Sequence, residues 1–309
     1  MLNNTTTDTQ SLESLIVAYY SLILVIIGTL FNCLTFFVLC RSTFRDKKAR
    51  PIIHYMRTIA IFDILMLYGW NLDHYLVIVH EFRLVKYSIV SCKCISFISY
   101  FTSQTSAWLR VFVCFDRYLS LSHFHRPWMN RSKTVLIIIA CVIMTSILLN
   151  LHILIFACYR KHNGTISIQA QSYRIYPLWN HVNLGVYNCG PFILMVMLNS
   201  GVSYHLFRFH HTNSTPNSRI QHRAITLTLV ITTSLFLVMT IPATVAYAYF
   251  MQANVTILHF LDAILYTYHV LSFPLYLITF NEFRRACIEM LTCKFGRRKV
   301  APLIHPPQW

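Results

Sequence analysis

The sequence predicts an all-α membrane protein, a bundle of seven transmembrane helices with its N-terminus outside and its C-terminus inside. Three observations predict this fold class. The 309-residue chain is 56% hydrophobic and only 12% charged, about half the charged fraction of a soluble domain. Its apolar residues gather into seven blocks, each long enough to cross a bilayer core, which takes about 20 helical residues. Its basic residues concentrate in alternate connections between those blocks.

The apolar blocks define the expected helices. We place them at residues 15–40, 54–79, 92–121, 134–157, 182–208, 223–250 and 257–280. Residues 1–14 are expected to form an extracellular tail, 15–281 the membrane domain, and 282–309 a short amphipathic helix followed by a cytoplasmic tail. Because no basic n-region and no small-residue cleavage site precede the first helix, we expect it to be a retained signal anchor.

The basic residues set the expected orientation. Eighteen Lys and Arg residues fall in the connection 41–53, the connections that follow the third and fifth helices, and the C-terminal tail, against six on the opposite side. Since positively charged loops face the cytoplasm, the C-terminus is predicted to be inside. Nucleic acid is excluded as a partner, because membrane spans separate the charged loops.

Glycosylation sequons agree in part with this orientation. Two further sequons, at Asn130 and Asn213, would lie inside, and a sequon alone is a weak signal. The sequons on the predicted outer side, which are the expected glycosylation sites, begin at Asn3, Asn4, Asn163 and Asn254.

The third helix carries a polar stripe. Ser99, Ser103, Ser106, Arg110 and Arg117 follow one another at spacings of 4, 3, 4 and 7 residues, which keeps them on one helical face. A face this polar cannot contact lipid, so it is expected to point into the bundle.

Arg110 needs a partner if it points into the bundle. An unpaired cation there would be costly, and Asp63 in the second helix lies at a similar depth. We therefore predict an Arg110–Asp63 pair. The alternative is that Arg110 extends along apolar neighbours to reach the cytoplasmic side.

The stretch "VFVCFDRYLSL", residues 111–121, breaks an apolar run with Asp116, Arg117 and Tyr118. At the end of a third helix this sequence resembles the rhodopsin-like family of G-protein-coupled receptors, whose third helix ends in Asp/Glu-Arg-Tyr. The resemblance covers nearly the whole chain. Residues that match the family in order and spacing are Asn32, Asp63, Cys92, Pro191, Phe236, Pro242, Tyr276 and Phe283.

Some residues depart from the family pattern. Ser272 replaces the Asn of the seventh-helix Asn-Pro-x-x-Tyr motif, its proline moves to Pro274, and Thr240 replaces the usual sixth-helix Trp. In these features the chain is similar to invertebrate neuropeptide receptors of the FMRFamide-receptor type.

The resemblance implies a coupling role for one group of residues at the inner end. In the family, the Arg117 position pairs with its acidic neighbour at rest and turns toward the G protein on activation, as a two-state element biased by a distant ligand. The alternative is a charge pair at a helix end, solvated at the membrane edge. The residues expected to serve coupling are Asp116, Arg117, Tyr118 and Tyr276.

The resemblance also implies a switch at Phe236 and Pro242 and a polar core inside the membrane. In the family, the positions of Asp63, Ser106 and Ser272 hold a sodium ion, and the Arg110 guanidinium would take its place. The expected polar core consists of Asn32, Asp63, Ser106, Arg110 and Ser272.

A ligand cavity is implied at the outer end. Two acids beside aromatic residues would suit a cationic, aromatic ligand, such as an amidated peptide that contains Arg. The alternative is that the acids are solvated near the headgroups. Ser99 stands where amine receptors carry their ammonium-binding Asp, which disfavours a monoamine. The expected ligand-binding residues are Asp73, Ser99, Tyr100, Gln104, Trp179, Asp262 and Tyr266.

Cysteine positions allow one outer disulfide. Either Cys92 or Cys94 can pair with Cys158 on an oxidising face. The family spacing, 25 residues before Arg117, favours Cys92.

We therefore expect a plasma-membrane receptor that binds an extracellular ligand, a small neuropeptide, and activates a heterotrimeric G protein. Its partners are that ligand, the G protein and membrane lipid, and it needs no enzyme activity, cofactor or metal. Covalently bound retinal is excluded because no Lys occurs between Lys161 and Lys294. The His residues are too scattered for a metal hydrolase site. The alternative is a membrane transporter that uses Asp63 and Arg110 as intramembrane charges.

Overall fold

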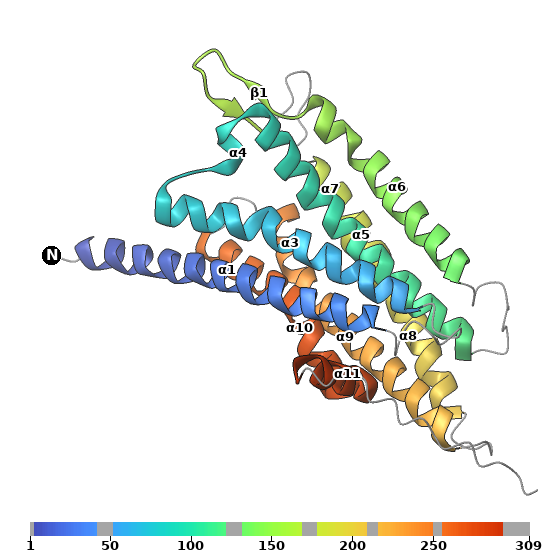
Figure 1. Ribbon diagram of the computed structural model, residues 1–309. Coiled ribbons are helices and arrows are strands. Elements are labelled where there is room, and N and C mark those ends of the chain that lie inside the picture. The colour runs from blue at the N-terminus through green and yellow to red at the C-terminus, as the bar shows by residue number, and fades with distance from the viewer. Residues whose placement is uncertain are drawn as a thin grey trace, which may run out of the picture.

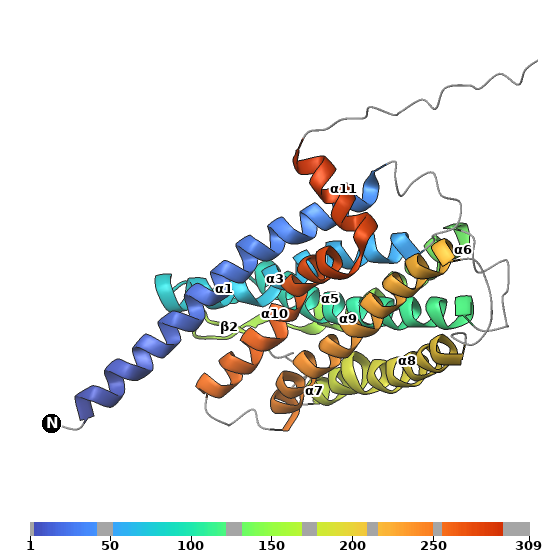
Figure 2. The same cartoon turned by 90° about the horizontal axis from the view of Figure 1, so that it is seen from below.

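The computed structural model describes residues 3–41, 52–121, 132–168, 178–208, 216–249 and 255–292. Nearly all of them are helical, and the long helices lie side by side in one bundle (Figures 1 and 2). The long helices are α1 (Asn3–Cys40), α3 (Ile52–His80), α5 (Ile89–Leu121), α6 (Ser132–Phe156), α8 (Gly190–Arg208), α9 (Pro216–Tyr249) and α10 (Val255–Thr279).

Short elements connect and close the bundle. The short helix α7 (Leu178–Asn183) and the π-helix η1 (Leu184–Cys189) run directly into α8. The remaining elements are α4 (Leu84–Tyr87), α11 (Asn281–Leu291) and the antiparallel strands β1 (Tyr159–Arg160) and β2 (Ile166–Ser167). Figure 1 places α4 and β1 at the same end of the bundle.

In the part of the chain that the structure describes, six helical segments are long and apolar enough to cross a membrane. They span Leu12–Cys40, Ile52–His80, Ser132–Phe156, Leu178–His205, Val230–Tyr249 and Ile257–Thr279. Large apolar side chains stay exposed along them, such as Ile137 and Leu148 on α6, at 62% and 64%. An apolar outer surface of this extent fits a lipid environment. The chain is therefore an all-α, multi-pass membrane protein.

The helix α5 is as long as the others but too polar to be among those six segments. It packs against α3, α6, α8, η1 and α9. This central position explains its composition, because its polar side chains point inward. Ser103, Ser106, Arg110 and Arg117 are at most 7% exposed, so the predicted inward orientation of the stripe is confirmed.

The helix α1 begins earlier than predicted. Residues 3–14, expected as an extracellular tail, continue α1 without a break. Neither Gly nor Pro occurs in this segment, so no residue there opposes helix formation sterically. The described apolar segment of α1, Leu12–Cys40, contains the first predicted span at 15–40.

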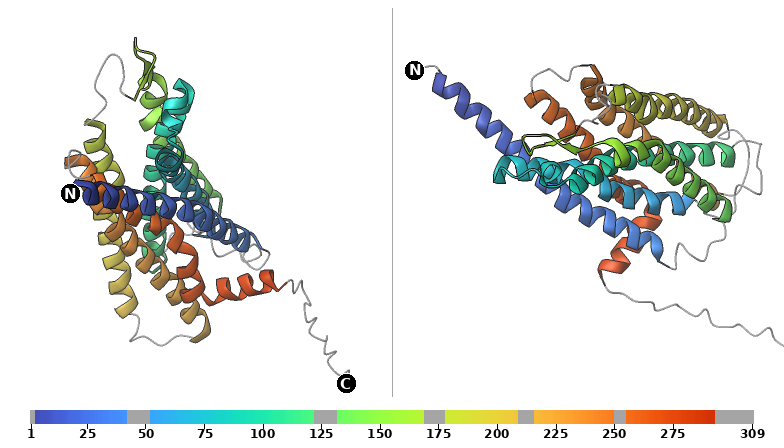
Figure 3. Two further views of the ribbon diagram at one scale, coloured as in Figure 1. Left: turned by 90° about the vertical axis from the view of Figure 1, so that its left-hand side faces the viewer. Right: turned by 90° about the horizontal axis from the view of Figure 1, so that it is seen from above.

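The predicted amphipathic helix after the last span is confirmed as α11, which lies across the end of the bundle (Figure 3). It buries Phe283, Ala286 and Cys287, whereas Arg284 and Arg285 on its other side are exposed. The Phe283 ring packs edge-on against Tyr276, with 5.6 Å between ring centroids. This contact fixes α11 to α10.

A rearranged turn connects α7 to α8. The Gly190 N–H donates to the Gly185 carbonyl, five residues back. In an α-helix it would donate to Val186 instead, so the Val186 carbonyl takes another donor, Trp108 Nε1 on α5, at 3.1 Å. A side chain of the central helix thus completes the hydrogen bonding of the π-turn.

Candidate functional site

The centre of the bundle holds a buried ion pair. Arg110 on α5 donates from Nη2 to both carboxylate oxygens of Asp63 on α3, at 2.9 and 3.0 Å. Asp63 is 0% and Arg110 3% exposed. The predicted pair is confirmed. The alternative, in which Arg110 extends to the cytoplasmic side, is wrong, because the two-oxygen bond to Asp63 directs the guanidinium inward.

Further side chains complete this charge cluster, which consists of Asp63, Ser106, Arg110, Tyr268 and His269. Asp63 Oδ1 also accepts from Ser106 Oγ at 3.2 Å and lies 2.8 Å from His269 Nδ1. Arg110 Nε donates to Tyr268 Oη at 2.8 Å, and Arg110 Nη1 donates to the Ser106 carbonyl at 3.0 Å. The carboxylate and the guanidinium are thus both satisfied inside the protein.

Aromatic rings enclose the guanidinium. The Arg110 Cζ atom lies 5.0 Å from the Phe236 ring centroid and 4.9 Å from that of Tyr268. Both distances suit cation–π attraction. Arg110 therefore connects its own helix to α3 through Asp63, to α9 through Phe236 and to α10 through Tyr268.

Two other predicted core residues lie at the edges of the cluster. Asn32 Nδ2 donates to the carbonyls of Gly28 and His269, both at 2.9 Å, and so bridges α1 and α10. Ser272 is 4% exposed and lines a small cavity with Arg110, Tyr268 and Tyr276. The cavity has room for about one water molecule. The cavity lies on the side of the cluster that faces the C-terminal end of α5, since Val113 also lines it.

The sequence interpretation missed Tyr268 and His269 as members of the cluster. A usable signal existed for His269, because it lies three residues before Ser272 and therefore on the same face of α10. Tyr268 carried no such signal, since an aromatic residue in an apolar helix is usually a packing residue.

The predicted switch residues lie next to the cluster. Phe236 is fully buried, with its ring edge-on to Tyr187 at 5.8 Å and to Tyr268 at 5.2 Å. Pro242 lies inside α9, which continues through it. Near this proline, Thr240 Oγ1 donates to the Phe236 carbonyl at 2.7 Å.

A second ion pair ends α5. Arg117 donates from Nη2 to Asp116 at 2.8 Å and is only 7% exposed. Its Nε atom is buried without a hydrogen-bond partner among the described residues. Tyr118 packs against α8 at Gly201, and Tyr276 on α10 is 4% exposed. Among the described residues, the ion-pair partner of the buried Arg117 is Asp116, its own neighbour in the chain.

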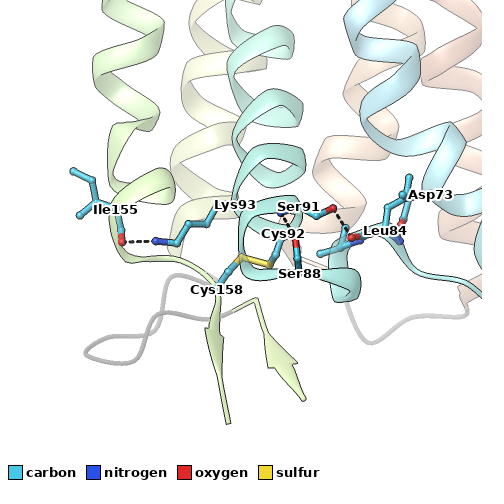
Figure 4. The surroundings of a disulfide bond; sticks show 9 residues. Asp73, Leu84, Ser88, Ser91, Cys92, Lys93, Ile155 and Cys158 are labelled. Atoms are coloured by element: carbon cyan, nitrogen blue, oxygen red, sulfur yellow. Dashed lines mark hydrogen bonds between the residues drawn. A yellow bond between two sulfur atoms is a disulfide. The ribbon is translucent and has the colours of Figure 1, made fainter. Parts of the chain in front are cut away.

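The opposite end carries the disulfide between Cys92 and Cys158, whose Cα atoms are 6.0 Å apart. It ties the start of α5 to the segment after α6 (Figure 4). Close by, Lys93 Nζ donates to the Ile155 carbonyl at 2.9 Å. Cys94, the other cysteine considered for this bond, is exposed and free.

The two acids expected in a ligand cavity hold separate structural partners. Asp73 Oδ1 accepts from the backbone N–H groups of Leu84 and Val85, at 2.7 and 3.4 Å, and so caps α4 (Figure 4). Asp262 is 5% exposed and accepts a hydrogen bond from the Tyr247 hydroxyl. Asp262 is therefore not a solvated acid near the headgroups, whereas Asp73 is half-buried.

Three other expected ligand residues, Tyr100, Gln104 and Trp179, lie in a polar set between α5, α6 and α7. Gln104 donates to Asn183 at 3.0 Å and accepts from Asn150 at 2.7 Å. Tyr100 donates to Asn180 at 3.1 Å, and its ring lies 6.2 Å from that of Trp179.

Ser99 and Tyr266 lie apart from this set. Ser99 donates weakly to the Gly69 carbonyl, at 3.4 Å. Tyr266 packs in an apolar cluster with Leu24 and Leu265.

The predicted glycosylation sites are described unevenly. Asn163 is exposed in the β1–β2 turn, where its Oδ1 accepts from the Thr165 N–H and hydroxyl. The backbones of Asn3 and Asn4 open α1, but their side chains, like the whole of Asn254, lie outside the described residues.

Comparisons with known proteins give no family for this chain. No family model and no curated protein matches it. The conclusions about its function therefore depend on the geometry of its own residues.

Proposed function

We propose that the chain is a G-protein-coupled receptor of the plasma membrane. It binds a small extracellular peptide between the helix ends near the disulfide and activates a heterotrimeric G protein at the opposite end. It catalyses no covalent reaction itself.

Seven spans and an outer N-terminus belong to this proposal. The helix α5 is the seventh span, since its polar side chains are buried among neighbouring helices and need not meet lipid. The excess of basic residues on one side supports a cytoplasmic C-terminus. The Cys92–Cys158 disulfide, near the other ends of the helices, supports an oxidising outer face there.

The observation that carries the proposal is the state of Arg117. Among the described residues, the buried Arg117 guanidinium is bound by the adjacent Asp116 and its Nε atom has no partner, which leaves the cation incompletely satisfied for a purely structural role. This state suits a group that leaves its neighbour to meet a partner protein. The C-terminus of a helix in the partner protein would suit the Arg117 cation, because it presents free carbonyl oxygens and the negative end of the helix dipole.

The charge cluster supports coupling between the two ends. Arg110 holds α3, α9 and α10 together midway along α5. A ligand that shifts α9 or α10 at the disulfide end changes the free energy of the Arg110 contacts. A ligand can couple the two ends only if it changes the relative free energies of two conformational states in this way.

The same cluster weighs against the transporter alternative. A substrate or ion that used Asp63 or Arg110 would have to displace the partner that already satisfies it. The two proposals are separated by measurement of substrate flux against ligand-stimulated nucleotide exchange in the same liposomes.

A neuropeptide library tests the proposed function. Cells that express the chain are screened with calcium and cAMP readouts, against untransfected cells. We expect at least one peptide to give a saturable, receptor-dependent response. Peptide-independent solute flux through the protein, without any G-protein response, would contradict the proposal.

A further inference from the structure

A pair of histidines joins three helices near the disulfide end. His74 on α3 and His259 on α10 approach each other, with 3.3 Å between His74 Nε2 and His259 Nδ1. On the other side of the His74 ring, Nδ1 lies 3.1 Å from Ser21 Oγ on α1. His74 is 6% exposed, whereas His259 is half-buried and lies near the start of its helix.

The hydroxyl of Ser21 fixes which nitrogen of His74 carries the proton. Ser21 Oγ donates to the Val17 carbonyl at 3.1 Å, so its lone pairs face His74. His74 Nδ1 must then be the donor to Ser21, which leaves a lone pair on Nε2, directed toward His259. A histidine held by a hydrogen bond at one nitrogen and free at the other is the usual arrangement of a metal ligand.

The distance between the two facing nitrogens also fits a shared metal ion. At 3.3 Å the two nitrogens are within hydrogen-bonding distance of each other in the absence of metal. Two nitrogens bound to one Zn²⁺ at about 2.0–2.1 Å in tetrahedral geometry lie about 3.3–3.4 Å apart. The rings meet edge-on, with 4.4 Å between their centroids, so a shared ion requires the two rings to rotate and move apart until both lone pairs point at it.

We propose that His74 and His259 form a binding site for a divalent transition-metal ion, with Zn²⁺ as the biological ion. Imidazole nitrogens select Zn²⁺ or Cu²⁺ over Mg²⁺ and Ca²⁺, which prefer oxygen ligands. The proton on His259 Nδ1 moves to Nε2, so both rings bind in their neutral form. The bound ion links α3 to α10 directly.

The site supplies two protein ligands, and water completes the coordination. Among the described residues no group of three or more His, Cys, Asp or Glu side chains could hold a metal. Asp262, one turn further along α10, is bound to Tyr247. Trp70 instead forms an aromatic wall, stacked on His74 with 6.1 Å between ring centroids. With two protein ligands the site has fewer than the four of a structural Zn²⁺ site, so we expect the ion to bind reversibly.

Thermal unfolding of the full chain in lipid nanodiscs, cleared of metal by EDTA, tests the site. We expect Zn²⁺ to raise the unfolding temperature with a saturable midpoint, and Mg²⁺ and Ca²⁺ at equal concentration to have no effect. His74→Gln and His259→Asn keep a polar atom near the bonded nitrogen but remove the imidazole. Each should weaken the midpoint by at least about tenfold, and Ser21→Ala by about tenfold.

His181→Asn is the matched control, because His181 is an exposed histidine on α7. It should keep the response of the unmodified protein. An unchanged midpoint in both ligand variants, or no response of the unmodified protein, would overturn the site. If the variants do not fold, the Cu²⁺ electron paramagnetic resonance spectrum of the unmodified protein decides. Two nitrogen ligands per ion are expected, and one or none would overturn the site. Neither readout involves signalling, so the result is independent of the proposed receptor function.

Discussion

The charge of Arg110 is buried and is held in place by residues on other helices. Arg110 is 3% exposed, bonded to both oxygens of Asp63 and enclosed by the Phe236 and Tyr268 rings. Removal of one partner of such a pair leaves an uncompensated charge, which costs about 3–5 kcal/mol. Replacement of both partners by uncharged groups costs much less. This asymmetry gives the pair a measurable signature.

The first prediction is a double-mutant cycle with Arg110→Leu, Asp63→Asn and both together. Each single variant should lower the free energy of unfolding by about 3–5 kcal/mol, and the double variant by clearly less than their sum. Thermal unfolding in membranes measures the cycle. The unmodified protein should also be insensitive to sodium, because the guanidinium occupies the carboxylate. Additive losses, or sodium-dependent stability in the unmodified protein, would rule out the pair.

The second prediction concerns Asp73. As a cap of α4, Asp73→Ala should destabilise the protein by about 0.5–2 kcal/mol, whereas Asp73→Asn, which keeps an acceptor oxygen, should have almost no effect. Hydrogen exchange at residues 84–87 and agonist potency measure the two roles separately. A large loss of potency in Asp73→Asn, with normal stability, would instead assign the charge to ligand binding.

At the residue scale, the sequence predicts which charges inside the membrane must pair, but it does not predict the structural partners of the acids near the helix ends. Arg110 and Asp63 are predictable because an intramembrane charge must pair and few candidates exist at that depth. The role of Asp73 is not, because it depends on where the short helix α4 lies after the chain turns. The role of Asp262 is likewise set by Tyr247 on another helix, which no local pattern reveals.

At the scale of elements, the packing of α5 on α8 depends on one glycine. A Cβ atom at Gly201 would lie 2.7 Å from Cε2 and 2.9 Å from Cδ2 of Tyr118. Atoms cannot approach this closely, so the ring or the helix would have to move. Since Tyr118 follows Arg117 directly, the displacement would reach the end of α5 that carries the Asp116–Arg117 pair.

The third prediction is that Gly201→Ala lowers the free energy of unfolding by about 1–3 kcal/mol through overpacking. Gly185→Ala is the matched control, because a Cβ at Gly185 meets nothing within 4 Å. Thermal unfolding of both variants measures the difference. Equal stability of the two would show that α5 and α8 are not in close contact there.

Helix positions were predictable because long apolar blocks have few alternatives. The predicted blocks lie within helices or continuous helical segments, except that the blocks that end at 157, 250 and 280 run one residue past the ends of α6, α9 and α10. Their ends were less predictable. The start of α1 at Asn3 lacks an apolar signal. The π-turn at Leu184–Cys189 depends on Trp108 from another helix, which a local pattern cannot contain.

At the scale of the whole molecule, the fourth prediction concerns topology. Seven spans place the two termini on opposite sides of the membrane, whereas six would place them on the same side. An N-terminal epitope should be accessible on intact cells and a C-terminal epitope only after permeabilisation. Asn163→Gln should remove one glycan from the protein. Both epitopes on one side would contradict α5 as a span.

The central claim is that the inner end of α5 activates a G protein, and Arg117→Ala tests it most directly. The protein in nanodiscs is combined with purified heterotrimers and a peptide identified by the library, and nucleotide exchange is measured. Arg285→Ala is the matched control, since Arg285 is an exposed α11 arginine whose side chain is 84% exposed. We predict that Arg117→Ala binds the peptide but does not accelerate exchange, while Arg285→Ala behaves as the unmodified protein. Full peptide-stimulated exchange by Arg117→Ala would contradict the account.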